Sequence, residues 1–503
     1  MVESLVRRIL YWAKETPRKQ AVAFKTETLS YSELSARIVC AANRLLEIGI
    51  KKGDRVLLLA VSKPEMVVAY LAIQYIGAVT VFMDKDLSGE RVIELYNCAK
   101  AELVLTDKCL AEIEGSCHIY SLRQLYMEDN VNTISVYSEP SPDELAEIIY
   151  TSGTTGKQKG CMLSYKAVSN IWMNTINGIG MKKSDVVLIP LPLNHSFALR
   201  VLRGTLYLGA TVVLQNGFTF AKQIEDNIER YHCNALIMVP ASVETIMKQM
   251  QDQFARIMGS FRYIEVGAGA LSVDQRKKLV EMLPHTQIYN TWGSSESGGV
   301  IFYNVTAAIK SNIERCFSAL GKPIEGVEIV TIDSYGEVCN GNEQNPGRMG
   351  LRGNNLMLGY YNDPELTKTA FLDGYLLTND LVYRDDDGLL HMLGRTDDII
   401  NVGGEKVSPI EIENVFSEYI GIDECACIGV VDKEGILGNV PILYYTSSES
   451  KIDDNELRQF ASSKLERFKI PSRYIKIDKL PRNSMFKIDK GALRSRWNME
   501  CDT

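Results

Sequence analysis

A loop rich in glycine and hydroxyl groups follows an apolar run near residue 150. Residues 148–160 read IIYTSGTTGKQKG. Glycines let backbone N–H groups turn toward a ligand, and the hydroxyl and lysine side chains add donors for phosphate oxygens. The loop therefore predicts a polyphosphate site. It is not the P-loop of kinases and NTPases, because that pattern needs a glycine where Thr151 stands.

Further segments whose residue types could bind a ligand or take part in a reaction follow in order along the chain. They are NTWGSSE at 290–296, TND at 378–380, GRTDD at 394–398, GGEKVSP at 403–409 and PRNSMFKIDK at 481–490. Their side chains include the indole of Trp292 and the carboxylates of Glu296 and Asp380.

This ordered set resembles the signatures of the adenylate-forming superfamily, which includes acyl-CoA synthetases, nonribosomal-peptide adenylation domains and luciferases. The resemblance covers nearly the whole chain, because residues 29–34 and 49–56 also fit the N-terminal pattern of the family. Three positions depart from that pattern. Gln158 replaces a proline, Asn379 replaces a glycine and so needs a tolerant backbone, and Phe486 replaces the glycine before the expected catalytic lysine.

The resemblance implies ATP and Mg²⁺ as ligands and assigns residues to them. The phosphate loop is Thr151, Ser152, Gly153, Thr154, Thr155, Gly156 and Lys159, with Lys157 as a further donor. Adenine is expected against Gly267, Ala268, Gly269, Asn290, Thr291, Trp292, Gly293 and Ser294. Ser295 would meet the α-phosphate, Glu296 would hold Mg²⁺, and Asp380 and Arg395 would bind the ribose.

The C-terminal motifs imply a moving lid. Lys487 falls on the catalytic lysine of the family and would bridge the substrate carboxylate and the α-phosphate, with Lys490 as a weaker alternative. Asp397 is expected to be the hinge. After rotation, Gly403, Gly404 and Lys406 would line the tunnel for the attacking thiol, and the wording of this segment is closer to CoA ligases than to peptide-synthetase domains.

The acyl pocket is expected at His195, Ser196, Arg200 and Gly267. Amino-acid-activating members carry an aspartate at the position of Ser196, which pairs with the substrate ammonium, so an amino-acid substrate is disfavoured. Arg200 would suit a second anionic or strongly polar group on the acid, and the alternative is an arginine on an outward helix face. For His195 the alternative is a packed core histidine.

The elements that must position these residues alternate between β-rich runs and amphipathic helical stretches. Strands are expected at 55–60, 103–106, 186–189, 235–239 and 264–266, and a helix at 62–75 with Ser62 as its N-cap. We therefore expect an α/β fold with a large N-terminal domain of parallel-type sheets flanked by helices. It would span residues 1–395 with a β subdomain at about 306–395, and residues 396–503 would form a small, mobile α+β lid.

Composition limits the function. The chain has 503 residues, 55 Lys+Arg, 63 Asp+Glu and a net charge of −8, which disfavours nucleic acid as a partner. Eleven scattered cysteines favour a reducing cytoplasm, and Cys425 and Cys427 are expected at alternate positions of a strand. The uncharged run 67–83 is interpreted as a buried α/β unit rather than a membrane span. Residues 464–496 are rich in basic side chains and form a candidate phosphate-binding segment.

These features predict an ATP-dependent acid–thiol ligase, an AMP-forming acyl-CoA synthetase. It would make acyl-AMP and pyrophosphate, then pass the acyl group to coenzyme A. Fatty, aryl and dicarboxylic acids all stay open as substrates, as does the oligomeric state. Two alternatives remain: loading of an acyl-carrier protein, and a nucleotide-binding homologue that has lost catalysis.

Overall fold

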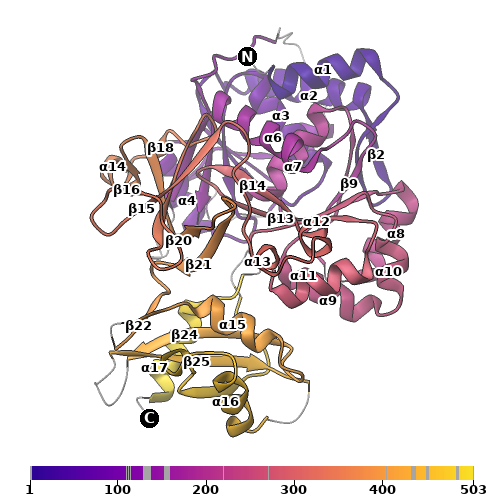
Figure 1. Ribbon diagram of the computed structural model, residues 1–503. Coiled ribbons are helices and arrows are strands. Elements are labelled where there is room, and N and C mark those ends of the chain that lie inside the picture. Colours follow the sequence, from indigo (N-terminus) through magenta and orange to yellow (C-terminus); the bar gives the residue numbers. More distant parts are fainter. Residues whose placement is uncertain are drawn as a thin grey trace.

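The structure is a computed structural model in which a large body sits above a small lid (Figure 1). It describes residues 3–108, 110, 113, 115–127, 137–151, 159–218, 220–269, 271–403, 405–431, 438–448, 452–482 and 487–501, the last two by their backbone alone. The predicted phosphate-loop residues Ser152, Gly153, Thr154, Thr155 and Gly156, together with Lys157, Gln158, Gly404 and Phe486, lie outside the described residues.

The larger sheet of the body has eight strands in the order β14-β13-β12-β11-β9-β10-β1-β2. Its strands are β1 (Gln20–Phe24), β2 (Glu27–Ser30), β9 (Val186–Ile189), β10 (Thr211–Leu214), β11 (Ala235–Met238), β12 (Tyr263–Gly267), β13 (Gln287–Ser294) and β14 (Gly298–Asn304). The sheet is parallel except at its ends, where β1 pairs with β2 and β13 with β14 in antiparallel fashion.

A second body sheet has seven strands in the order β18-β8-β7-β4-β3-β5-β6. They are β3 (Arg55–Leu59), β4 (Val79–Met83), β5 (Leu103–Thr106), β6 (Ile119–Ser121), β7 (Leu145–Thr151), β8 (Lys159–Ser164) and β18 (Gly359–Tyr360). Strands β3 to β7 run parallel, and β8 returns antiparallel to β7. The expected strands therefore form, but they divide between two sheets.

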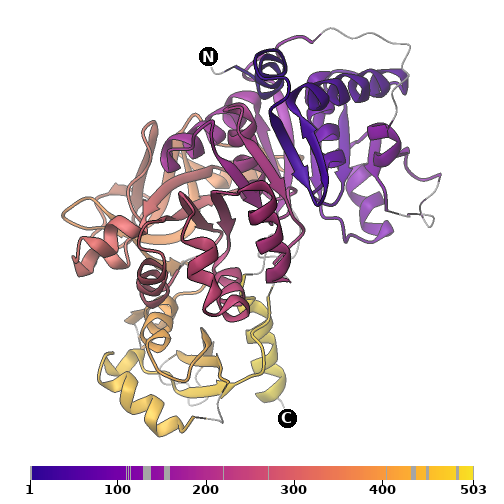
Figure 2. The same cartoon turned by 90° about the vertical axis from the view of Figure 1, so that its right-hand side faces the viewer.

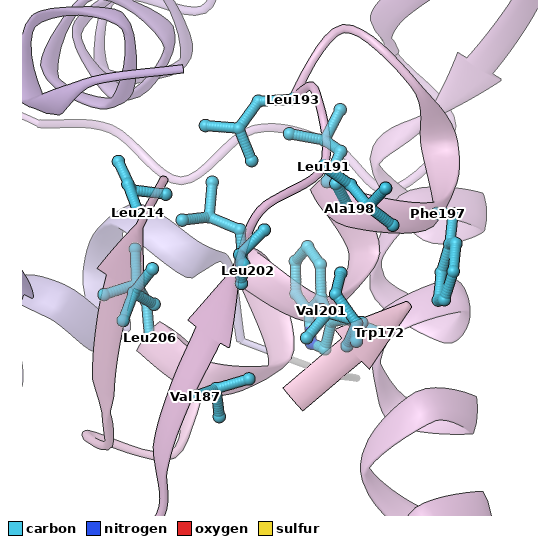
Figure 3. Packing of buried hydrophobic residues seen from close by; sticks show 14 of the residues in the cluster. Trp172, Val187, Leu191, Leu193, Phe197, Ala198, Val201, Leu202, Leu206 and Leu214 are labelled. Carbon is cyan, nitrogen blue, oxygen red and sulfur yellow. The ribbon is translucent and has the colours of Figure 1, made fainter. Parts of the chain in front are cut away.

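Helices cover and separate these sheets (Figure 2). They are α1 (Leu5–Glu15), α2 (Tyr31–Glu47), α3 (Pro64–Tyr75), α4 (Gly89–Ala99), α5 (Leu122–Met127), α6 (Tyr165–Ile179), α7 (Ser196–Tyr207), α8 (Ala221–Tyr231), α9 (Pro240–Met250), α10 (Gln253–Met258), α11 (Val273–Met282), α12 (Val305–Lys310) and α13 (Glu314–Phe317). Helix α7 packs its apolar side chains against β9 and β10, where Leu202 and Leu206 lie near Val187 and Leu214 (Figure 3).

An antiparallel sheet stands beside the body. It contains β15 (Val327–Ile332), β16 (Val338–Cys339), β17 (Gly347–Gly353), β19 (Phe371–Leu372), β20 (Tyr375–Arg384) and β21 (Leu390–Arg395), and α14 (Pro364–Ala370) lies among them. The short strands and turns expected in the β subdomain are confirmed, although its first strand begins at Val327. Residues 305–317 form helices instead.

The lid follows β21 and has a hydrophobic core of its own. It holds the hairpin β22 (Ile400–Val402) and β23 (Glu405–Val407), and a sheet of β24 (Glu424–Val431), β25 (Asn439–Thr446) and β26 (Arg473–Lys476). Its helices are α15 (Pro409–Ser417), α16 (Asp454–Ser462) and α17 (Lys490–Cys501), with a short 3₁₀ turn at Arg467–Lys469. Cys425 and Cys427 alternate along β24, as expected.

One local prediction is wrong. Ser62 does not cap α3, whose N-cap is Lys63 without a side-chain bond; the Ser62 hydroxyl instead accepts a hydrogen bond from the backbone N–H of Leu193, at 2.9 Å. The uncharged run from residue 67 divides into α3 and β4, and every side chain of α3 except Glu65 is buried. Within the part of the chain that the structure describes, no helix has the length and apolarity to cross a membrane.

Helix α7 is tied to both body sheets by buried ion pairs. Arg200 contacts Glu265 of β12 in the larger sheet, and Arg203, one turn later, contacts Glu147 of β7 in the second sheet. Both carboxylates have no exposed surface. Arg203 also donates through Nε to the hydroxyl of Tyr70 at 2.9 Å. Because each charge is buried, each pair holds only while both partners are present.

We expect Arg203→Met to lower the free energy of unfolding by about 3–5 kcal/mol, because Glu147 would stay buried without its counter-charge. The midpoint of urea unfolding measures the change. Arg7→Met removes the exposed ion pair with Glu139 and should shift the midpoint far less, because water and salt screen that pair. Equal stability of the two variants would contradict the importance given to the buried pair.

Candidate active site

A cleft of about 1960 Å³ lies between the body, the antiparallel sheet and the lid. It brings together most of the predicted residues from across the sequence. Those that line it are Thr151, Lys159, His195, Ser196, Arg200, Ala268, Gly269, Asn290, Thr291, Trp292, Gly293, Ser294, Ser295, Glu296, Asp380, Arg395, Lys406 and Lys487. Gly267, Asp397 and Gly403 are not part of the lining. Residues more than 300 positions apart thus share one cavity.

The two ends of the predicted phosphate loop are held next to each other. Thr151 ends β7 and Lys159 begins β8, and the two residues are direct partners in the antiparallel pairing. The ammonium of Lys159 lies 5.6 Å from the ring centre of Tyr360. The hydroxyl of Tyr360 in turn donates to Oε1 of Glu296 at 3.0 Å. Tyr360 therefore links the phosphate-loop lysine to the predicted Mg²⁺ ligand.

Asp380 lies at the centre of a cationic neighbourhood. It is part of β20, and the Trp292 side chain hydrogen-bonds to it. Burial raises the pKa of Asp380, whereas the charges of Arg395 and Lys487 and the bond from Trp292 oppose that rise. Neighbouring Asn379 belongs to the same extended strand and has no positive φ, so the glycine-like backbone expected there is wrong. Its amide instead donates to Asp397 at 3.0 Å.

The side chain of Asn290 is occupied inside the body. Its Oδ1 accepts from Nη2 of Arg276 at 2.9 Å, and its Nδ2 donates to the carbonyl oxygens of Val266 and Gly269, at 3.0 and 3.3 Å. Arg276 also donates to the carbonyls of Phe317 and Ala319, at 2.9 and 2.8 Å. Asn290 thus holds the turn after β12 in place, which is a different use of the amide from a contact with an adenine edge.

Small residues leave room beside that turn. A Cβ on Gly267 would stand 2.9 Å from the ring of Phe197, and one on Gly269 would stand 3.2 Å from Pro240. Ala268 between them has φ of +61°, a left-handed conformation that its small side chain tolerates. The small-residue wall predicted from the sequence is therefore sterically required at Gly267.

His195 stands at the start of α7 and lines the cleft. Burial, together with the charge of Lys487, lowers its pKa to about 4 against the opposing effect of Asp84. The imidazole is therefore neutral at pH 7. Its electrostatic contact with Lys487 places the lid lysine near the predicted acyl pocket.

Lys487 and Lys490 have different surroundings. Lys487 projects into the cleft, where burial and then the charge of Arg395 lower its pKa, against the effect of Asp380 and Glu296. The ammonium of Lys490 instead contacts Oε1 of Glu413 at 2.7 Å within the lid. Of the two candidates, Lys487 is the one whose charge meets the body carboxylates.

Several basic side chains of the segment 464–496 are paired inside the lid. Lys464 contacts Glu418, Lys469 contacts Glu411 and Glu466, Arg482 contacts Glu424, and Arg494 contacts Asp398. These carboxylates offset much of the positive charge that the sequence pattern shows. The segment is therefore less suited to bind phosphate than its composition indicates.

The lid also contacts the body at a cluster of acidic residues. Lys248 of α9 contacts Asp423 at 3.3 Å, and Glu244, one turn earlier, shares a hydrogen bond with Glu424 at the start of β24. Burial and then the charge of Glu424 raise the pKa of Glu244 to about 7. Gln275 donates to Glu244, and Arg482 contacts Glu424 from the lid side. Two carboxyl groups this close favour a shared proton.

Sequence patterns did not identify four of these residues. Tyr360, Arg276, Glu244 and Asp84 lie outside the recognised motifs, and their partners are distant along the chain. A lone glutamate in an apolar strand, as in residues 263–267, is the kind of signal that could have indicated the buried pair of Arg200. No comparable signal marks Tyr360.

Comparisons with known proteins agree with this geometry. The family model described as AMP-binding enzyme matches residues 10–361, and that of the AMP-binding enzyme C-terminal domain matches residues 411–487. The 2-succinylbenzoate–CoA ligase of Bacillus licheniformis is 31% identical over 491 residues, covering 95% of this chain and 98% of the relative. The Bacillus subtilis ligase of the same name is 29% identical over 488 residues, covering 96% of each.

Two solved structures are similar over nearly the whole chain. The o-succinylbenzoate CoA synthetase of Bacillus subtilis, in complex with the acyl-adenylate intermediate OSB-AMP, has a TM-score of 0.86 and 26% identity, covering 97% of both chains. ATP-bound MatB from Rhodopseudomonas palustris has a TM-score of 0.89 and 25% identity, covering 99% of both. With these matches and a single cleft that collects the family motifs, the chain belongs to the AMP-binding enzyme family.

Proposed function

We propose that the chain is an ATP-dependent acid–CoA ligase. It would join a carboxylic acid to ATP to give acyl-AMP and pyrophosphate, and then transfer the acyl group to coenzyme A with release of AMP. The observation that carries this proposal is the meeting of Lys487 from the lid with Asp380 and Glu296 from the body in one cleft. That arrangement unites the predicted groups for the carboxylate, the ribose and the metal.

The residues of the cleft fit an ATP–Mg²⁺ complex. Within the described residues, no cluster of three or more His, Cys, Asp or Glu side chains could hold a metal by itself. Mg²⁺ often binds through one or two carboxylates together with substrate phosphates and water, so the carboxylate of Glu296 in this cleft suits it. When bound, Mg²⁺ offsets charge on the phosphate oxygens. The hydroxyl of Tyr360 donates to the carboxylate of Glu296, and Asp380 would accept the ribose hydroxyls.

The first half-reaction needs charge neutralised more than it needs a protein nucleophile. The acid carboxylate attacks the α-phosphorus, and the bond to pyrophosphate breaks. Lys487 would offset the negative charge of both reacting groups, because it points into the cleft and is near neutral His195. Ser295 would meet the α-phosphate, and Lys159 would bind the departing pyrophosphate; both residues line the cleft.

The second half-reaction requires the lid to move. We infer a hinge at Asp397, which the amide of Asn379 contacts from β20. Gly403 lies in the turn between β22 and β23 with φ of +58°, away from the cleft lining, while Lys406 borders the cleft. A rotation that withdraws Lys487 would bring this turn, with Gly404, toward the acyl-adenylate, where the CoA thiol attacks the acyl carbon and AMP leaves.

The residues of the predicted acyl pocket limit which acids the chain would use. Ser196 at the first position of α7 gives no counter-charge for an ammonium group, which supports a substrate other than an amino acid. The relatives named above act on 2-succinylbenzoate, so this acid belongs in the first panel.

The described cysteines are free, which supports the proposed cytoplasmic location.

Acid-dependent exchange between ATP and pyrophosphate tests the proposed function. We expect exchange with at least one acid of a broad panel, and acid-dependent AMP release on addition of CoA. Lys487→Ala should slow exchange by about 100-fold or more, because it removes a charge that stabilises the transition state. Lys479→Ala, which removes an exposed lid lysine, should leave the rate unchanged. Absence of exchange with every acid would overturn the proposal. If AMP were released only in the presence of an acyl-carrier protein, that protein and not CoA would be the acceptor.

The Tyr360–Glu296 bond predicts a change in metal affinity. Tyr360→Phe removes the hydroxyl that orients the Glu296 carboxylate, and groups of this kind commonly alter metal affinity by about tenfold or more. We expect a higher Mg²⁺ requirement and weaker Mn²⁺ binding in the presence of a non-hydrolysable ATP analogue, measured by electron paramagnetic resonance. Tyr361→Phe is the matched control, because its hydroxyl donates to the carbonyl of Ala99 instead. Equal Mn²⁺ affinity in both variants would refute the role of Tyr360.

The Glu244–Glu424 contact predicts pH-dependent closure. With the lid closed, the pKa of Glu244 is about 7, against an ordinary value of 4.5. Closure therefore takes up a proton between these values, and the closed state loses stability as pH rises toward 7 and then levels off. Fluorescence energy transfer between dyes on lid and body, with AMP present, measures the closed fraction.

Glu244→Gln keeps a neutral hydrogen-bonding side chain and should flatten this pH dependence. Glu281→Gln, an exposed site on α11, should not change it. Identical pH profiles for wild type and Glu244→Gln would show that this contact does not govern closure.

A further inference from the structure

The guanidinium of Arg200 lies close to two aromatic rings beside the predicted acyl pocket. Its Cζ lies 4.8 Å from the ring centre of Phe197 and 5.3 Å from that of Phe302. Only 4% of the side chain is exposed. The outward-facing position considered in the sequence analysis is therefore wrong, because Arg200 is buried and borders the cleft with Phe197, Gly298 and Gly299.

The hydrogen bonds of this guanidinium are incomplete. Nη1 donates to Oγ1 of Thr175 at 3.0 Å, and Nη2 donates to Oε1 of Glu265 at 2.5 Å. An arginine carries five N–H donors, and the described residues supply no acceptor for the other three. Gly299 leaves the Nε edge without a covering side chain, since a Cβ there would stand 3.2 Å from Nε. Arg200 lines the cleft, so a donor on this edge that no protein oxygen occupies suits a ligand oxygen.

The charge of Arg200 is already balanced. Glu265 has no exposed surface, and its Oε1 also accepts from the hydroxyl of Thr291 at 2.6 Å. Arg200 and Glu265 together carry no net charge. A second carboxylate on the substrate would enter this site without a net counter-charge, and it would approach the negative charge of Glu265. A neutral oxygen would gain the same hydrogen bonds without that cost.

We propose that the acid carries an uncharged hydrogen-bond acceptor, such as a ketone, ester, ether or amide oxygen, at the end remote from the reacting carboxylate, and that Arg200 binds it. Glu265 is a positioning residue that orients Arg200 and cancels its charge. This inference rests on the proposed ligase function and names its substrate class. It narrows the earlier expectation, which allowed an anionic as well as a polar group.

The test uses sets of three acids. The acids of one set share the same alkyl or aryl scaffold and differ only at the end remote from the reacting carboxylate. In each set the remote end is a methyl ester or ketone, a carboxylate, or an alkyl group of similar size, and 2-succinylbenzoate extends the panel. We expect the neutral acceptor to give the highest kcat/KM in acid-dependent AMP release, by about tenfold or more over the alkyl acid, because a hydrogen bond to a charged donor is at stake. A wild-type preference for the dicarboxylic acids would overturn the inference.

Two variants then show whether Arg200 and Glu265 set the preference among these acids, and a control variant shows the effect of breaking a buried ion pair elsewhere. Arg200→Leu should lose the preference for the acceptor over the alkyl acid. Glu265→Gln leaves the charge of Arg200 unbalanced, so it should raise the ratio of kcat/KM for the dicarboxylic acid over the ester by about tenfold. Glu147→Gln is the matched control, because it alters the equivalent buried pair of Arg203, which does not line the cleft.

The possible failures are distinguishable. If no acid supports exchange between ATP and pyrophosphate, the ligase function fails. If acids support exchange but the ratios are flat in wild type, or Glu265→Gln shifts them no more than Glu147→Gln, the ligase function stands and the role of Arg200 is refuted. If Glu265→Gln does not fold, the wild-type panel alone decides.

Discussion

The pairing of two arginines on one helix with two buried glutamates holds this body together. Arg200 and Arg203 lie one turn apart on α7, and they reach Glu265 of the larger sheet and Glu147 of the second. Each strand buries a carboxylate that would otherwise be unstable in an apolar interior, so the helix must sit where both can be neutralised. The relative position of the two sheets therefore depends on α7.

The same constraint shapes the cleft. Helix α7 begins at Ser196, directly after His195, and both line the cavity, so the helix that joins the sheets also presents the predicted acyl-pocket residues. Phe197 packs against Gly267 at the end of β12, and Glu265 lies two residues earlier on that strand. Because Thr291 of β13 bonds to the same carboxylate, the strand that carries Trp292 is held in register with the pocket wall.

The sequence allowed much of the fold to be predicted where the signal was local. The strand at residue 55, the helix after it and the alternation of Cys425 and Cys427 follow from short-range patterns of polarity. The site residues inside recognised motifs were assigned to one site by their resemblance to a family, and most of them line one cleft. Contacts between distant segments could not be predicted in this way. The Tyr360–Glu296 bond spans 64 positions, and Ser62 was diverted from its expected cap by a backbone N–H 131 positions away.

In the lid, ion pairs between distant residues change what a basic stretch of sequence indicates about phosphate binding. Its basic segment has the pattern of a phosphate-binding region, yet several of its cations form ion pairs with carboxylates of the same lid. Lys487 differs, since the carboxylates near it, Asp380 and Glu296, belong to the body and are also the predicted ligands of ribose and metal. The ammonium of Lys487 is attracted by two carboxylates that the nucleotide would also use, while burial and Arg395 oppose its charge. The positive charge of Lys487 thus attracts the closed lid to the body and also serves the proposed chemistry. This attraction must be overcome when the lid rotates for the second half-reaction.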